Sequence, residues 1–292
     1  MRAWQRLTAL MAPTLALVAG LAALPALSLA NDGTEYHFGF TAGTSIGEVG
    51  EKEIQSRLTG RVGKRAGHYT ALSNKLEWES VPAQDLRVSL ATYVTHHRIA
   101  GVPDLDDNRS GAFDGLAFGL KYRLLDRDRG PFGLAIEAEP QWRRRDETSG
   151  APVDQIGGQY SVSLDREFVP NRIISAFNLV YEPEASRSRI TGVWSRESTV
   201  RVATAIMAQA RPDILFGMEA RYLRKYEGLS LDDFAGHALY LGPTVSARLP
   251  GGYWLLAAWN VQVAGRAVDE LGSLDLVNFE RHQVRLKFGF NY

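Results

Sequence analysis

Apolar and polar side chains alternate with a period of two along most of this chain, and the alternation is strictest at its C-terminal end. In residues 282–292 (HQVRLKFGFNY) an apolar or aromatic side chain stands at every second position, with basic and small residues between. Because a strand sends successive side chains to opposite faces, this pattern predicts a strand with one wholly apolar face. That face consists of Val284, Leu286, Phe288, Phe290 and Tyr292.

The same alternation recurs upstream, and short turns containing Pro or Gly are followed in turn by longer polar loops. This asymmetry is typical of transmembrane β-barrels. We therefore predict an all-β fold, a transmembrane antiparallel up-and-down β-barrel with twelve strands over residues 53–292. The predicted strands cover residues 54–62, 72–78, 86–95, 116–124, 132–145, 160–165, 173–182, 200–206, 216–222, 239–248, 253–262 and 282–292. The predicted long loops are 98–112, 146–157, 183–197, 225–235 and 265–278.

An even number of strands places both ends of the barrel domain on the same, periplasmic side. Residues 31–52 would then form a periplasmic N-terminal segment. Within it, Tyr36 to Thr44 (YHFGFTAGT) also alternates and would make a thirteenth strand. We expect this stretch to be a periplasmic segment, an extension of the first strand or a partial plug of the barrel.

The N-terminus has the features of a secretory signal peptide. Arg2 and Arg6 precede a short apolar run that ends in Ser28-Leu29-Ala30. A charged start, an apolar middle and small residues before the cut predict cleavage after Ala30, so residues 1–30 would be removed. The alternative, an uncleaved anchoring helix, fits less well because prolines interrupt the apolar run.

Composition supports export and argues against nucleic-acid binding. The sequence has no cysteine, which suits passage through an oxidising periplasm. It has 33 basic and 33 acidic residues, and removing the two arginines of the signal peptide leaves 31 basic residues. Since no helix-length apolar segment follows residue 30, the chain can cross a membrane only by closed, alternating strands.

The apolar, aromatic-ended C-terminal strand resembles the signature strand of bacterial outer-membrane β-barrels. The layout, including Gly47 to Gly67 (GEVGEKEIQSRLTGRVGKRAG), resembles proteobacterial barrels grouped with the outer-membrane protein of the phenol meta-degradation pathway. The resemblance implies a Gram-negative outer-membrane location, contact with outer-membrane lipids and lipopolysaccharide, and recognition by the barrel assembly machinery through the C-terminal strand.

A soluble β-sandwich or lipocalin-like barrel is the competing fold, and it would turn its apolar face inward. It would not need aromatic residues near the strand ends, where a membrane barrel carries its aromatic girdle. The residues expected in such a girdle are Tyr122, Trp142, Tyr181, Tyr222 and Tyr253.

The inward positions of the predicted strands carry about fourteen basic residues against about six acidic ones, which would favour anions in a water-filled lumen. The alternative is that these charges pair between strands and fill the barrel, with Glu137 and Glu139 opposite Lys121 or Arg123. The predicted lumen residues are Arg57, Arg61, Lys75, Arg87, Lys121, Arg123, Glu137, Glu139, Arg143, Arg145, Arg201, Glu219, Arg221, Arg248, Arg281, Arg285 and Lys287. Glu77, Asp165 and Glu182 complete the acidic set.

Function must be argued from this lumen, because the fold does not specify it. A twelve-stranded barrel lies between filled eight-stranded barrels and open porins, so we expect a narrow channel for small solutes, with anions or aromatic molecules as candidates. The alternatives are a lipid-modifying enzyme with a Ser-His pair, or a closed structural or adhesin barrel. His96 and His97 with Asp104, Asp106 and Asp107 suggest a metal site at the rim, but no catalytic residues, cofactor or metal are predicted.

Overall fold

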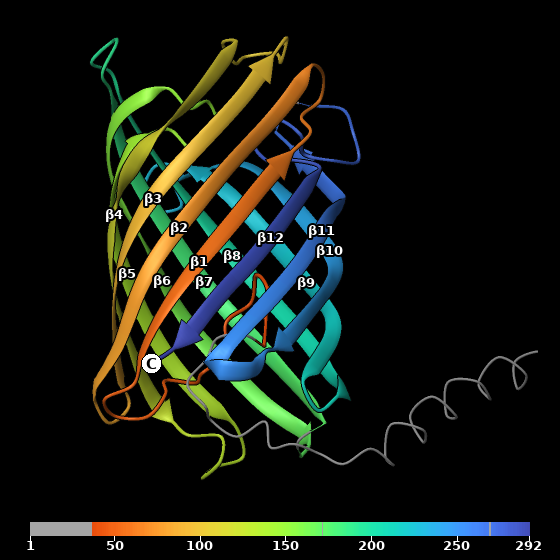
Figure 1. Cartoon of the computed structure of the whole chain (residues 1–292). Coiled ribbons are helices and arrows are strands. Elements are labelled where there is room, and N and C mark those ends of the chain that lie inside the picture. Colours follow the sequence, from red (N-terminus) through yellow and green to blue (C-terminus); the bar gives the residue numbers. More distant parts are fainter. Residues whose placement is uncertain (1–36, 171, 269) are drawn as a thin grey trace, which may run out of the picture.

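Twelve antiparallel strands form a single closed barrel in the computed structural model, which describes residues 37–170, 172–268 and 270–292 (Figure 1). Each strand pairs with its sequence neighbours, and β1 pairs with β12 to close the barrel. The strands are β1 (Lys52–Val62), β2 (His68–Ala83), β3 (Leu86–Ala100), β4 (Asn108–Leu125), β5 (Gly133–Arg145), β6 (Pro152–Val169), β7 (Ile173–Ser188), β8 (Trp194–Arg211), β9 (Ile214–Glu227), β10 (Asp233–Arg248), β11 (Tyr253–Ala267) and β12 (His282–Asn291). The predicted fold class and strand number are confirmed.

A single short 3-10 turn, η2 (Pro250–Gly252), accompanies the strands in the described part of the chain. No helix among these residues is long and apolar enough to cross a membrane. The predicted signal peptide and its cleavage after Ala30 lie outside the described residues.

The outer face of the barrel is apolar and the inner face is polar, as the period-two pattern predicts. In β12, Leu286 and Phe288 are exposed on the outside while Gln283 and Lys287 are buried inside. A continuous apolar outer surface of this kind requires an apolar environment. Most inward positions are polar or small, and the buried apolar side chains of the interior form separate clusters rather than a single core.

The predicted aromatic girdle is present with one exception. Tyr122, Trp142, Tyr222 and Tyr253 are exposed on the outer face. Tyr181 is instead half-buried, because its hydroxyl donates a hydrogen bond to the backbone oxygen of Leu229 in the β9–β10 turn. A tyrosine hydroxyl that is withdrawn from water usually has such a partner, and the sequence pattern could not locate this one.

The strands are longer and the loops shorter than the sequence predicted. β4, β6 and β8 each have 18 residues, whereas about 9–11 suffice to cross a bilayer. The polar stretches assigned to loops continue the strand pairing beyond the apolar belt. Strands can continue to pair beyond the apolar belt, where an apolar outer face is no longer needed. The first polar residues therefore show where the apolar belt ends, not where the strand ends.

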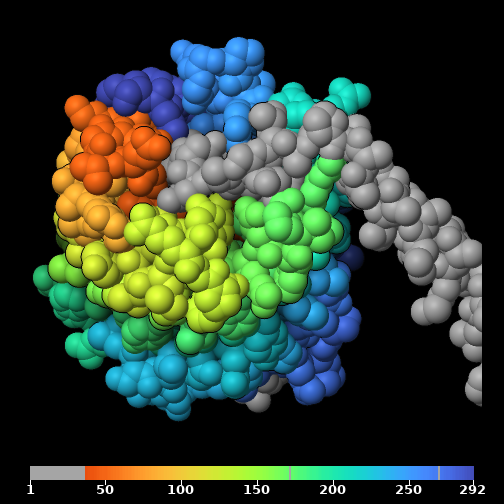
Figure 2. Space-filling view, turned by 90° about the horizontal axis from the view of Figure 1, so that it is seen from below, coloured from red at the N-terminus to blue at the C-terminus, as the bar shows by residue number. Residues whose placement is uncertain are grey.

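The two ends of the barrel differ. The turn end carries the connections between β2 and β3, β4 and β5, β6 and β7, β8 and β9, and β10 and β11, together with the C-terminus (Figure 1). The loop end carries the other connections, the longest being residues 268–281 between β11 and β12. Figure 2 views the turn end, where the β4–β5 turn (residues 126–132, yellow-green) lies over the end face.

Candidate functional site in the barrel lumen

Residues 37–46, the inner segment, lie inside the barrel rather than in its wall. In Figure 1 they form an orange-red hairpin that rises from the turn end and is seen behind β11 and β12. None of them belongs to a strand, although His37, Phe38 and Phe40 are buried. In the described residues 37–44, the alternating stretch that could have made a thirteenth strand therefore takes no place in the sheet.

Three polar side chains of the wall accept hydrogen bonds from backbone N–H groups of the inner segment, and Arg285 and Lys287 donate to its carbonyl oxygens. Both carboxylate oxygens of Glu219 on β9 accept hydrogen bonds, from the N–H of Gly39 (2.5 Å) and of Phe40 (2.8 Å). The Asn178 amide on β7 accepts from the N–H of Ala42 (2.6 Å) and donates to its carbonyl oxygen (2.8 Å). Backbone N–H groups that are buried need hydrogen-bond acceptors, which a neighbouring strand would normally provide. Here side-chain oxygens provide them, so the segment does not need to pair with a strand.

Asp165 on β6 is the third anchor. Its carboxylate accepts hydrogen bonds from the N–H (2.8 Å) and the hydroxyl (2.7 Å) of Thr44. Arg127, from the β4–β5 turn, forms an ion pair with the same carboxylate at 2.9 Å. Gly133 makes room for this contact, since a Cβ there would lie 2.2 Å from the Thr44 hydroxyl.

The inner segment also covers an apolar part of the inner wall. Phe38 and Phe40 pack in a buried cluster with side chains from β7, β8, β9 and β11. The other members are Ile174, Ala176, Ala205, Met207, Leu215, Trp254, Leu256 and Ala258. Burying these side chains stabilises the segment in the lumen by the hydrophobic effect, since the same surface would otherwise face water in the lumen.

A chamber of about 270 Å³ lies in the lumen, and Phe40, Thr41 and Ala42 of the inner segment contribute to its lining. Its walls come from β1, β2, β3, β5, β6, β7, β8, β9 and β12, and residues 278–280 of the longest loop also contribute. Ten of the predicted lumen residues line it: Arg57, Arg61, Lys75, Glu137, Glu139, Arg143, Arg201, Arg221, Arg285 and Lys287.

The remaining predicted lumen residues lie outside the chamber. Arg87 pairs with Glu79 (3.1 Å) and Arg123 with Asp85 (2.7 Å) near the turn end. Arg145 donates to the carbonyl of Gly150 at the opposite end of the barrel. The other four also have no part in its lining: Lys121, Glu219, Arg248 and Arg281.

The chamber is nearly balanced in charge, in contrast to the excess of basic residues counted from the sequence. Nine basic and eight acidic side chains line it. The count from the sequence missed acidic residues on strand extensions and loops that fold back over the lumen. These are Asp146, Glu147, Glu184, Glu197 and Glu280.

Ion pairs across the interior stiffen one side of the wall. Lys75 on β2 contacts both Glu77 (2.8 Å) and Glu139 on β5 (2.5 Å), and the Tyr93 hydroxyl donates to Glu139 (3.0 Å). Lys121 lies opposite Glu137 in the β4–β5 ladder. We considered pairing of Glu137 and Glu139 with basic residues of the adjacent strand. In the structure Glu139 also pairs with Lys75 of β2, which is not adjacent to β5.

Asp114 is an inward-facing residue that sequence reasoning missed. It sits at a bulge of β4 opposite the Tyr93/Val94 step of β3, is fully buried, and accepts hydrogen bonds from Nε of Arg143 (2.8 Å) and the N–H of Arg145 (2.7 Å). A bulge adds one residue and reverses the side-chain alternation, so the period-two pattern could not assign its face. The neighbouring Gly115 is the one feature of the sequence there that could have indicated a bulge.

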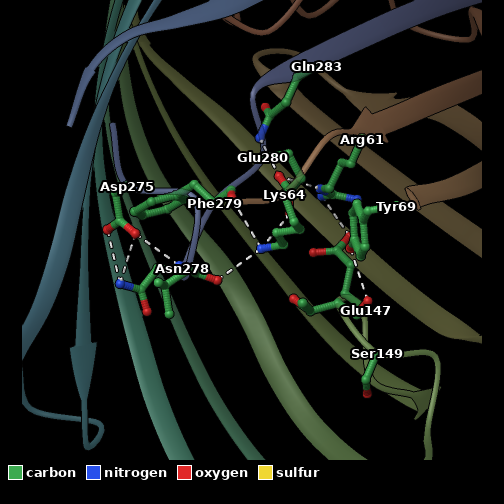
Figure 3. A network of polar contacts seen from close by, with 12 residues as sticks. Arg61, Lys64, Tyr69, Glu147, Ser149, Asp275, Asn278, Phe279, Glu280 and Gln283 are labelled. Carbon is green, nitrogen blue, oxygen red and sulfur yellow. Dashed lines mark hydrogen bonds and ion pairs between the residues drawn. The ribbon is translucent and has the colours of Figure 1, made fainter. Parts of the chain in front are cut away.

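At the loop end of the lumen, a polar network joins the β5–β6 loop and the connection before β12 to the wall (Figure 3). Arg61 pairs with Glu147 of the β5–β6 loop at 2.7 Å, and the Tyr69 hydroxyl donates to the carbonyl of Thr148 at 2.9 Å. Lys64 donates to the carbonyl of Phe279 at 3.1 Å, in the connection that precedes β12. These contacts tie both connections to β1, β2 and the turn between them.

The pKa of Glu147 lies below its ordinary value, although burial alone would raise it, because Arg61 and Arg143 favour the carboxylate. A lowered pKa means that this contact stabilises the loop fully above the ordinary glutamate range and is lost as the pH falls through the folded value. A spin label at Thr148→Cys should stay immobile from neutral pH to about pH 5 and become mobile only below that range. Glu147→Gln leaves the contacts of Tyr69 and His97 with this loop in place. The label should then be more mobile at neutral pH and lose this pH dependence, and equal mobility in both chains would contradict the pairing.

The histidines of β3 do not form a common site. His96 is exposed on the outer face, whereas His97 is buried inside and donates to the carbonyl of Glu147 at 3.0 Å. Adjacent residues of a strand face opposite sides, so the two imidazoles cannot bind one metal ion together. Within the described ranges, no group of three or more His, Asp or Glu side chains could hold a metal ion.

A family model matches residues 30–292, which is nearly the whole sequence. The chain belongs to DUF6662. This is a family of unknown function, so membership gives no activity or pathway. No curated protein matches the chain significantly.

Solved outer-membrane barrels have the same fold as this DUF6662 chain. The COG4313 outer membrane channel from Pseudomonas putida F1 has a TM-score of 0.55 at 11% identity, covering 84% of this chain and 96% of that one. The translocator domain of the autotransporter NalP from Neisseria meningitidis has a TM-score of 0.51 at 11% identity, covering 85% and 91%. The resemblance to outer-membrane barrels is confirmed at the level of fold, while the grouping with the phenol pathway stays a prediction.

Proposed function

We propose that this protein is an outer-membrane channel for small solutes whose lumen is closed toward the periplasm by the inner segment. The observation that carries the proposal is the charged chamber of about 270 Å³ inside the barrel, bounded on one side by a segment that is not part of the wall. A barrel built only as a scaffold would fill its lumen with wall side chains. Here a separate segment, held by a few hydrogen bonds, occupies that position.

The proposed location rests on the apolar outer belt, the predicted signal peptide and the shared fold with outer-membrane barrels. In this orientation the turn end faces the periplasm and the loop end faces the outside, as short turns and long loops do in such barrels. The outward-facing side chains at the C-terminal end would contact outer-membrane lipids and be recognised by the barrel assembly machinery. They run from Val284 to Tyr292.

The volume of the chamber limits the solutes. At about 270 Å³ it lies below the usual range for drug-sized ligands, so we propose solutes of a few heavy atoms to a small ring. The chamber lining is charged rather than apolar, which favours polar solutes over hydrocarbons.

Reconstitution in planar bilayers tests the proposal. The folded chain, purified from outer membranes, should show discrete openings separated by long closed periods. A folded, heat-modifiable barrel without any openings over a wide range of voltage would contradict a channel function and favour a structural role.

Cysteine labelling tests the orientation. Asp232 lies in a connection at the loop end and Gln84 in a turn at the turn end, and both are exposed. A membrane-impermeant maleimide added to intact cells should label Asp232→Cys but not Gln84→Cys, and both should react after the outer membrane is permeabilised. The opposite pattern in intact cells would reverse the proposed orientation.

A further inference from the structure

Two arginines of the chamber, the buried Arg221 and the half-buried Arg285, differ from several other cations of the lumen. Arg143 is paired with Asp114, Lys75 with Glu77 and Glu139, and Arg87 with Glu79. For Arg221 and Arg285, the described residues provide no carboxylate within ion-pair distance. A guanidinium removed from water without an opposite charge is costly, so this difference requires an explanation.

The partners of these arginines are neutral. Arg221, only 2% exposed, donates to the side-chain oxygens of Asn260 and Gln283, both at 2.8 Å. Arg285 donates to the Thr59 hydroxyl (3.2 Å) and to the carbonyl of Gly39 (3.3 Å). These contacts orient the guanidinium groups but do not neutralise them.

Both guanidinium groups stack on one aromatic ring of the inner segment. The distance to the Phe40 ring centre is 3.8 Å for Arg221 and 4.3 Å for Arg285. Cation–π contacts stabilise each group by a modest amount, yet they hold two like charges near each other. The ring therefore fixes the arginines in place without supplying a counter-charge.

The surrounding charges add to the imbalance. The charged groups that act most strongly on Arg285 are arginines, namely Arg57, Arg221, Arg201 and Arg61. Glu219 is the carboxylate that acts most strongly on Arg221, but it lies beyond ion-pair distance, and both of its oxygens accept hydrogen bonds from the inner segment. All four of the arginines around Arg285 line the chamber, as Arg285 itself does.

We propose that Arg221 and Arg285 form a binding site for a small anionic solute, one that carries a carboxylate or phosphate group, at the part of the chamber next to the inner segment. This inference rests on the proposed channel function and names the solute class. A planar guanidinium presents paired N–H donors that match the oxygens of such groups. The local cluster of positive charge, rather than the overall charge of the chamber, selects the anion.

Binding to the purified barrel in detergent tests the site without requiring conductance. Calorimetric titration with succinate and with inorganic phosphate should show saturable binding of at least one anion, and the neutral analogue succinamide should not bind. Arg285→Gln should weaken binding at least tenfold, and Arg285→Lys, which keeps the charge, should weaken it less. Arg224→Gln, on the exposed outer face of β9, is the matched control and should bind normally.

The two anions show which class of solute the site recognises. Tighter binding of succinate indicates carboxylates, and tighter binding of phosphate indicates phosphorylated solutes. Binding of neither anion, equal binding of succinamide, or unchanged binding after Arg285→Gln and Arg221→Gln would overturn the site. A conducting barrel that binds no anion would remove this inference alone. Anion binding to a barrel that never conducts would contradict the channel and leave the site intact.

Discussion

Replacing Glu219 by Ala should open the lumen. The substitution removes both acceptors that hold the N–H groups of Gly39 and Phe40, at 2.5 and 2.8 Å. Hydrogen bonds to a charged group contribute about 1.5–3 kcal/mol each, and lumen water can replace part of that loss. We expect a net change of about 2 kcal/mol, or roughly a thirtyfold increase in the ratio of open to closed channels. Single-channel recording measures this ratio directly as open probability.

Two further variants separate release of the inner segment from a general effect on the barrel. Glu227→Ala removes an exposed carboxylate at the end of the same strand and should leave the open probability unchanged. Glu219→Gln keeps one acceptor and should give an intermediate value. If Glu219→Ala behaves like the starting protein while Glu227→Ala does too, the inner segment is not held by this carboxylate.

Replacing Asp114 by Ala should cause the largest loss of stability. It leaves the buried Arg143 guanidinium without its carboxylate and the N–H of Arg145 without its acceptor. Breaking a buried ion pair by removing one partner costs about 3–5 kcal/mol. Urea unfolding of the barrel in phospholipid vesicles should show this decrease in the free energy of unfolding.

An exposed ion pair provides the control for that experiment. Asp154 pairs with Arg189 on the outside of the loop end, where both side chains are in water. Asp154→Ala should leave the unfolding midpoint nearly unchanged, because exposed pairs contribute little. The double substitution Asp114→Leu with Arg143→Met should recover part of the lost stability. A loss equal to that of Asp154→Ala would show that the buried pair is not structural.

The strands of the barrel wall were predictable because the alternation within each strand shows which of its faces is apolar. Val284, Leu286 and Phe288 must face outward if Lys287 faces inward, whatever the rest of the chain does. This rule gave the strand number and the inward side of most residues. It failed at Asp114, where a bulge shifts the alternation by one residue.

The contents of the lumen were not predictable in the same way. The alternation in residues 36–44 fits a strand as well as a plug, and the segment is placed inside by tertiary contacts, such as those with Asp165, Asn178 and Glu219, more than a hundred residues away. Likewise, Glu147 and Glu280 reach the lumen from connections whose path depends on tertiary contacts. The charge of the chamber depends on these residues, so a count over strand positions overestimated its basic excess.

Locking the inner segment to the wall tests most directly whether it closes the channel. A Cβ at Gly133 would lie 3.1 Å from that of Thr44 and 2.4 Å from Oδ1 of Asp165. A disulfide needs a Cβ–Cβ distance of about 3.5–4.5 Å, so joining Thr44→Cys and Gly133→Cys requires a small shift of the inner segment and of the Asp165 carboxylate. The chain has no cysteine of its own to interfere. Each single substitution serves as a control in planar bilayers.

The oxidised double variant should show almost no openings, and reduction with dithiothreitol should restore openings to the level of the single variants. That reversible change would establish that residues 37–46 must move for the channel to conduct. If the oxidised chain, with its cross-link verified by mass spectrometry, conducts as freely as the reduced one, the inner segment does not close the lumen.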